Sequence, residues 1–204
     1  MNGLSRFFSL TRASALVILL GLMVSGCGIN TIPTQEENAK AKWSDVLNQY
    51  QRRADLIPNL VETVKGYAAQ EKQVLEAVIN ARARATQTTL QVPPDILTNQ
   101  EAFKKFQEAQ SQLSGALGRL IAVSENYPDL KSNQNYLALQ SQLEGTENRI
   151  AVARRDYIEA VRAYNTELRT FPGVIWATVL YRNSKPMETF TIPDEMTKPP
   201  QVKF

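Results

Sequence analysis

Two acidic side chains, Glu144 and Glu147, stand three residues apart in a segment whose apolar residues have helical spacing. On a helix, this spacing places both carboxylates on one face. Neighbouring carboxylates can bind a divalent cation, or divide the roles of general acid and general base. Glu71 is a third candidate, because it interrupts the apolar stripe of another predicted helix. A metal-dependent enzyme, or an enzyme accessory subunit, that uses these three carboxylates is therefore one hypothesis.

The amino-acid composition narrows this chemistry. The 204 residues include no histidine and a single cysteine, Cys27. A Ser-His-Asp triad, a Cys-His pair and zinc sites built on histidine or several cysteines are therefore excluded. We accordingly predict no catalytic residue, no metal ligand and no cofactor, and we expect that the protein is not an enzyme.

The same acidic residues have a structural alternative. Glu144 and Glu147 can pair with arginines of neighbouring helices, and Arg149 lies beside them in the sequence. The candidate partners are Arg52, Arg82 and Arg154. A buried network of this kind would fix the register of the helices, and it is the simpler hypothesis.

A second polar cluster surrounds Pro58 and consists of Arg52, Arg53, Asp55 and Asn59. Two guanidinium groups offer bidentate contacts to a carboxylate or phosphate, so the cluster is a candidate partner-binding corner. The alternative is a corner between two helices. In that case Asp55 or Asn59 caps the second helix, Pro58 lies in its first turn, and the arginines pair locally.

The N-terminal segment has the composition of an export signal. Arg6 and Arg12 precede residues 13–26, which carry no charge. A basic region followed by an apolar stretch and small residues is typical of a secretory signal peptide, and this stretch is shorter than the ~20 residues of a spanning helix. Val24-Ser25-Gly26-Cys27 resembles the bacterial lipobox, whose cysteine is lipidated and becomes the first residue of the mature chain. We therefore predict a lipid on Cys27.

An uncleaved signal anchor is the alternative. The positive-inside rule would then keep Arg6 and Arg12 in the cytoplasm. Both hypotheses place residues 30–204 outside the cytoplasm, on the periplasmic or extracytoplasmic face. Gly28 follows Cys27 where many lipoproteins of the inner membrane have aspartate, which favours the outer membrane if the organism has one.

The remaining sequence predicts an all-α fold with long amphipathic helices. Residues 1–26 form the signal peptide or signal anchor, residues 27–33 a tether, residues 34–182 the helical bundle and residues 183–204 an extended tail. Three to four long helices joined by short connections favour an antiparallel up-and-down bundle.

Local signals set the expected boundaries. Thr34 and Thr98 each open a capping box, so we predict that they begin helices. Pro58 predicts a break or kink near residues 55–57. The apolar stripe that follows predicts one helix over residues 60–85.

The second half of the chain is predicted in the same way. Residues 86–98 contain Pro93-Pro94 and little periodicity, which indicates a loop. Tyr127-Pro128-Asp129 ends the next helix, and a final long helix covers residues 132–170. Residues 174–181 follow as a short helix.

Aromatic residues recur along these helices. At helical spacing in a bundle they are more typical of core than of a ligand groove. The set is Tyr67, Tyr127, Tyr136, Tyr157 and Tyr164. Trp176, Leu180 and Tyr181 come after the last long helix, and two positions stay open for them: the bilayer surface or the end of the bundle.

Several segments resemble the signatures of LemA-family proteins. They are Tyr50–Val61, Val64–Ala68, Ala81–Ala83, Leu113–Leu117, Glu125–Lys131, Leu143–Ile150, Tyr164-Asn165 and Phe171-Pro172. The resemblance covers residues 36–176 in the family's order. It implies a bacterial helical bundle held outside the cytoplasm by an N-terminal hydrophobic segment, without an established reaction.

The sequence differs from the usual family pattern at two positions. Gln70 stands where the family often has histidine, and Ile158 stands where asparagine is common. The first difference weakens any mechanism that needs a metal ligand at this position. The lipobox also differs from members with an uncleaved transmembrane helix.

We expect a membrane-tethered helical bundle of the cell envelope that acts as a non-enzymatic scaffold or adaptor for another, unknown, envelope protein. A lipid-binding or membrane-shaping protein is a further alternative. Removal of Arg6 and Arg12 with the signal lowers the net charge from +3 to +1. A nearly neutral body does not favour nucleic acid as a partner. The sequence does not indicate an oligomeric state.

Overall fold

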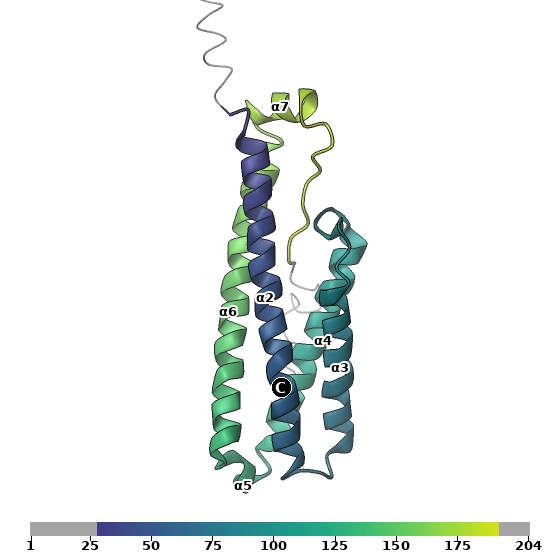
Figure 1. Cartoon of the computed structure of the whole chain (residues 1–204), viewed down its shortest axis with the longest axis vertical. Coiled ribbons are helices and arrows are strands. Elements are labelled where there is room, and N and C mark those ends of the chain that lie inside the picture. Colours follow the sequence, from purple (N-terminus) through teal and green to yellow (C-terminus); the bar gives the residue numbers. More distant parts are fainter. Residues whose placement is uncertain (1–27, 192–204) are drawn as a thin grey trace, which may run out of the picture.

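The computed structural model describes residues 28–191, and this part of the chain is helical without any strand (Figure 1). The elements are α2 (Thr31–Lys65), α3 (Lys72–Leu90), the 3-10 turn η1 (Ile96–Thr98), α4 (Gln100–Ser124), α5 (Pro128–Lys131), α6 (Gln134–Glu167) and α7 (Gly173–Val179). α2 packs against α6 and α3, and α3 packs against α4. The predicted antiparallel bundle of long helices is therefore confirmed. None of the helices within residues 28–191 is long and apolar enough to cross a bilayer.

The break predicted at Pro58 is wrong, because α2 continues through this residue to Lys65. The helical stripe of buried residues keeps its phase across the proline, from Tyr50 to Ile57 and on to Val64. The chain turns at residues 66–71 instead, so the helix predicted over residues 60–85 is divided between α2 and α3. Glu71 therefore lies just before α3 rather than on the face of a continuous helix.

Both predicted capping boxes are displaced. α2 begins at Thr31, so residues 31–33, the last of the predicted tether, are helical. Thr34 therefore does not cap the helix, and its hydroxyl donates to the Asn30 carbonyl oxygen at 2.7 Å. Asn99, not Thr98, caps α4, where its side chain accepts from the Ala102 amide at 3.1 Å. Asparagine is as effective an N-cap as serine or aspartate.

The other boundaries are close to the expected ones. α3 extends to Leu90, which shortens the predicted loop to residues 91–95 before η1. α4 ends at Ser124, before the predicted Tyr127-Pro128-Asp129 stop, and the short helix expected after the long ones is α7.

The buried apolar residues form two clusters. The α7-side cluster joins one end of α2 to α6, α4 and the tail, and includes Ile32, Trp43, Val46, Tyr50, Phe103, Phe106, Ile150, Tyr157, Val161, Tyr164, Met187 and Phe190. The α5-side cluster joins the other end of α2 to α3, α4 and α6, and includes Ile57, Leu60, Val61, Val64, Leu75, Val78, Leu113, Leu117, Leu120, Leu130, Tyr136 and Leu143. Along α2 the two clusters meet between Tyr50 and Ile57.

The described part of the tail, up to Thr191, has no regular element and packs against the bundle. It returns from α7 beside α2 and passes between α2 and the loop that joins α3 to α4 (Figure 1). Phe190 stacks with Trp43 at 6.0 Å between ring centroids and contacts Phe103 at 5.1 Å. Asn165 holds the Met187 backbone through two hydrogen bonds of 2.8 and 2.9 Å. The tail thus closes the α7-side cluster.

Candidate functional site

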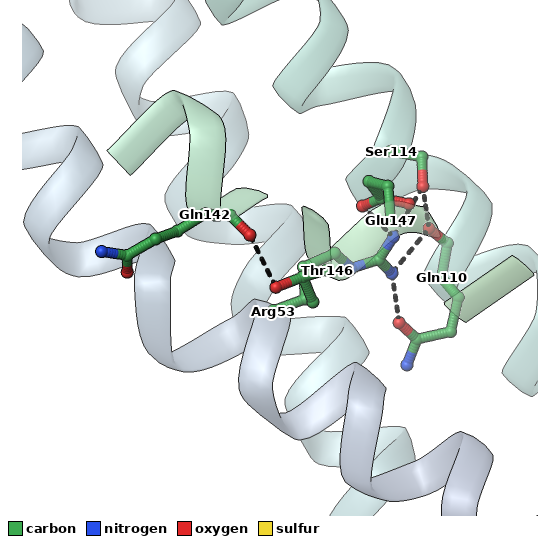
Figure 2. A network of polar contacts seen from close by, with 6 residues as sticks. All are labelled: Arg53, Gln110, Ser114, Gln142, Thr146 and Glu147. Atoms are coloured by element: carbon green, nitrogen blue, oxygen red, sulfur yellow. Dashed lines mark hydrogen bonds and ion pairs between the residues drawn. The ribbon is translucent and has the colours of Figure 1, made fainter. Parts of the chain in front are cut away.

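A buried arginine lies between the two apolar clusters. Arg53 of α2 is 1% exposed, and its Nη1 lies 3.0 Å from Glu147 Oε1 of α6 and 2.8 Å from Ser114 Oγ of α4 (Figure 2). Nη2 donates to Gln110 Oε1 of α4 at 2.6 Å. One guanidinium therefore connects three helices, with the planar geometry that suits several simultaneous acceptors.

Gln110 extends this network to a fourth helix. Its Nε2 donates to the Ala85 carbonyl oxygen at 3.3 Å and to the Thr89 hydroxyl at 3.1 Å, both on α3. Gln110 is only 4% exposed, so its amide oxygen and nitrogen both need internal partners, and both have them. Arg53, Gln110, Ser114 and Glu147 are called the polar layer below.

The polar layer is asymmetric in its access to solvent. The Glu147 side chain is 42% exposed, whereas Arg53 is buried. Arg53 also lies over the Tyr50 ring, 5.0 Å from its centroid, and burial raises the pKa of the Tyr50 hydroxyl. The Nε of Arg53 has no hydrogen-bond partner among the described residues. This arrangement neutralises a buried charge and joins helices, and its one carboxylate is already engaged.

Of the two polar clusters predicted from the sequence, only one member of each takes part in the polar layer. Arg53 and Glu147 meet, whereas the candidate partners expected for Glu147 were Arg52, Arg82 and Arg154. The remaining predicted residues are exposed on the surface and outside the polar layer. They are Arg52, Asp55, Asn59, Glu144 and Arg149. The hypothesis of a corner capped by Asp55 or Asn59 is wrong, because α2 is continuous there.

Gln110 and Ser114 were missed by the sequence analysis. Gln110 had a detectable signal, because it falls on the apolar stripe of α4 between Phe106 and Leu113. Arg53 falls on the stripe of α2 in the same way, between Tyr50 and Ile57. A polar residue at a core position of one helix predicts a polar partner on another.

A smaller set of polar contacts ties the turn after α2 to the turn after α4. The Tyr127 hydroxyl donates to Glu71 Oε1 at 2.7 Å and accepts from Gln70 Nε2 at 2.9 Å. The hydrogen bond to Glu71 raises the pKa of Tyr127. Asn133 Nδ2 donates to the Tyr67 hydroxyl at 2.8 Å in the same region.

The three carboxylates of the metal hypothesis have separate local partners. Glu71 accepts from Tyr127, Glu147 pairs with Arg53, and Glu144 accepts from Gln140 at 3.1 Å. Within residues 28–191, no group of three or more acidic, histidine or cysteine side chains could hold a metal ion. The geometry that this hypothesis requires is therefore absent from the described part of the chain.

Comparison with known proteins identifies the family. A profile of the LemA family matches residues 42–204. The chain belongs to the LemA family. This match confirms the resemblance seen in the sequence and extends it to the C-terminal tail, beyond residue 176.

Curated relatives of this LemA-family chain include magnetosome proteins. It is 30% identical over 157 residues to magnetosome protein MamQ 2 of Paramagnetospirillum magneticum, and 27% identical to magnetosome protein MamQ of Magnetospirillum gryphiswaldense. Each alignment covers 70% of this chain but 58% of the relative, so the chain spans less than two thirds of the length of these relatives. Protein LemA of Metamycoplasma hominis is 25% identical over 59% of this chain and 49% of its own length.

The segments that resemble LemA-family signatures meet in space. Arg53, Ser114 and Glu147 of the polar layer come from three of them, Tyr50–Val61, Leu113–Leu117 and Leu143–Ile150. Tyr67 and Tyr127 come from two more and lie at the α5 end. The signatures thus describe contacts between helices rather than an open pocket.

The five tyrosines predicted to lie in the core of this LemA-family bundle fall into a buried group and a partly exposed group. Tyr136, Tyr157 and Tyr164 are buried, as expected for core residues. Tyr67 is 43% exposed and Tyr127 is partly exposed, and both hydroxyls bond to polar residues of the turns. Ile158, at the second position that differs from the family pattern, packs against the α7-side cluster.

Proposed function

We propose that this LemA-family protein is a membrane-tethered bundle of the cell envelope, which acts as a non-enzymatic scaffold or adaptor for another envelope protein. Cys27 is its lipidation site, the bundle lies outside the cytoplasm, and no nucleic acid, metal or cofactor takes part. Cys27 lies outside the described residues, so this part of the proposal depends on the lipobox sequence and on the LemA-family resemblance.

The observation that carries the scaffold proposal is the closed pairing of Arg53 with Glu147 in the polar layer. The Glu147 carboxylate is bound at 3.0 Å by the buried Arg53 guanidinium. This contact supports a rigid body over a reactive centre, because the Glu147 carboxylate is already engaged by Arg53. The long α2 and α6 then offer extended exposed faces to a partner.

The relatives do not supply the partner. MamQ proteins are named as magnetosome proteins, and this chain spans 58% of their length. That name indicates no partner for this chain, so the proposal extends no further than an envelope protein as the partner.

Photo-crosslinking in cells tests the scaffold proposal. A photoreactive residue is placed singly at exposed Asn59 of α2, Lys104 of α4 or Val152 of α6, with the full chain otherwise unchanged. We expect a discrete adduct with an envelope protein from one helical face and none from the opposite one. Recovery of the chain only as an uncrosslinked monomer from all three positions would contradict the proposal.

The membrane tether has its own test. A Cys27→Ser variant should accumulate as an unprocessed precursor, because the lipidated thiol is absent. The matched control is Ser25→Ala, which keeps a small residue beside the cysteine. An unchanged size and unchanged membrane retention in Cys27→Ser would indicate a signal anchor instead.

A further inference from the structure

The exposed side of α7 is apolar. Half of the large hydrophobic residues that are exposed in the described part of the chain lie within ten residues, and they are 37% to 80% exposed: Phe171, Val174, Ile175, Val179 and Leu180. Val174, Ile175 and Val179 lie on one side of α7, and Phe171 and Leu180 flank the helix at its two ends. The opposite face is turned inward, where Gly173 is buried and Trp176 and Ala177 pack against the α7-side cluster.

Charged residues flank this apolar segment without interrupting it. Residues 170–181 carry no charge, whereas Arg169 and Arg182 stand at either end and Lys185 follows. All three basic residues are exposed. Exposed apolar side chains can enter the headgroup region of a bilayer, and basic side chains beside them are attracted to anionic lipid.

The start of the described chain lies against the same element. A Cβ built on Gly28 would be 3.5 Å from Pro172 Cγ and 3.9 Å from Trp176 Nε1, and the observed φ of +102° is one that glycine adopts readily. Gly28 is one peptide bond from Cys27. In Figure 1, α7 runs across the end of the bundle where α2 begins, nearly perpendicular to the long helices.

We propose that the exposed face of α7 lies in the headgroup region of an anionic phospholipid bilayer, and thereby holds the bundle upright on the membrane surface. The inference rests on the proposed attachment of Cys27 to that membrane. A lipid on Cys27 would leave the chain beside α7, so the bilayer is the surface that this face meets first. The basic residues at both ends of the segment complement the negative charge of the lipid.

The test uses spin labels on the full chain. The lipidated chain is reconstituted into vesicles that contain phosphatidylglycerol, and a nitroxide is attached to a single cysteine introduced by Ile175→Cys or Val179→Cys. Val152→Cys on α6 is the matched control, because Val152 is 48% exposed and Val179 is 56% exposed. Circular dichroism verifies that each labelled chain remains helical.

We expect the labels at 175 and 179 to collide more often with oxygen, which concentrates in lipid, than with a water-soluble nickel complex. The label at 152 should show the opposite preference. In vesicles of neutral lipid alone, the labels at positions 175 and 179 should enter the bilayer less deeply. The inference is overturned if these two labels match the control, and also if they are shielded from both quenchers, because a protein partner or second copy would then cover α7.

The experiment distinguishes a failure of the α7 placement from a failure of the Cys27 tether on which it rests. A chain that remains with the vesicles while its α7 labels face water contradicts only the placement of α7. A chain that leaves the vesicles altogether contradicts the tether, and the inference with it. Thiol labelling of the parent chain reports independently whether Cys27 is blocked.

Discussion

The Nε of Arg82 donates to the backbone oxygen of Ala54 at 2.8 Å, and thereby supplies the hydrogen bond that Pro58 cannot make. In an α-helix the oxygen of residue 54 would accept from the amide of residue 58, but proline has no amide hydrogen. Ala54 is 4% exposed, so water is a poor substitute. A side chain of α3 thus sustains the helix of α2.

Replacing Arg82 should therefore destabilise the protein through Ala54. We expect Arg82→Met to cost about 1–3 kcal/mol, the range for leaving a buried backbone acceptor without a partner. The neighbouring Arg84 is exposed, and Arg84→Met is the matched control. Denaturant unfolding followed by circular dichroism measures both.

The same mechanism predicts non-additivity with the proline. Pro58→Ala restores an amide to the helix, so it should stabilise the chain and reduce the cost of Arg82→Met. A double-mutant cycle measures the difference. Equal costs of Arg82→Met with and without the proline would show that Arg82 acts through some other contact.

The polar layer predicts an order of effects among three variants. Arg53→Met leaves Gln110 and Ser114 without their shared donor and should cost about 3 kcal/mol. Glu147→Gln should cost about 1 kcal/mol, because its side chain is 42% exposed and an amide oxygen still accepts from Arg53.

Glu144→Gln is the control for this order, because Glu144 is exposed and outside the polar layer. Its effect should lie within about 0.5 kcal/mol of zero. Unfolding midpoints of the three variants give the comparison. If Glu144→Gln lowered the stability as much as Glu147→Gln does, the pairing of Glu147 with Arg53 would not be the contact that stabilises the bundle.

The buried tyrosines predict instability at high pH. Burial raises the pKa of the Tyr157 hydroxyl, which donates to the Glu188 carbonyl oxygen at 2.8 Å. The unfolded chain releases this proton near pH 10, before the folded chain does. The unfolded state therefore gains relative to the folded state as the pH rises above about 10, and stability falls.

Tyr157→Phe should be less stable than the parent chain at neutral pH, because it lacks the bond to Glu188. It should also lose less stability between pH 8 and pH 11. Denaturant unfolding at the two pH values measures this slope. An identical slope in both chains would exclude Tyr157 as a source of the alkaline instability.

The tail predicts a large effect from a residue near the end of the chain. Phe190 is 8% exposed and contacts three aromatic rings, those of Trp43, Phe103 and Tyr157. Phe190→Ala should cost about 3 kcal/mol, as is usual when a buried phenyl ring is removed. It should also expose the tail to limited proteolysis. Thr191→Ala, at an exposed position, should leave both measurements unchanged.

The helical bundle could be predicted from the sequence because apolar spacing is a local property of each helix. The positions of the breaks could not. Pro58 is locally a strong helix breaker, and the contact that overrides it comes from Arg82, 28 residues later. The turn at Gly66 had a weaker local signal, because the apolar stripe continues on both sides of it.

The presence of a polar network between helices could be predicted from the sequence, but the residues that pair in it could not. The sequence indicated a network of glutamate and arginine, but the choice between Arg52 and Arg53 depends on which residue faces the core. The α2 stripe places Arg53 inside, between Tyr50 and Ile57. The role of Phe190 could not be derived from local pattern, because an extended tail has no periodicity that indicates what it covers.

The contact of Trp43 with Phe190 has a consequence for the timing of folding. The two rings are separated by most of the described chain, yet their centroids lie 6.0 Å apart in one cluster. The loop between them must close before that cluster is complete, and contacts of such high sequence separation form late. The α7-side half of the protein therefore stays incomplete during synthesis until Phe190 has emerged, whereas the contacts of the α5-side cluster can form before that point.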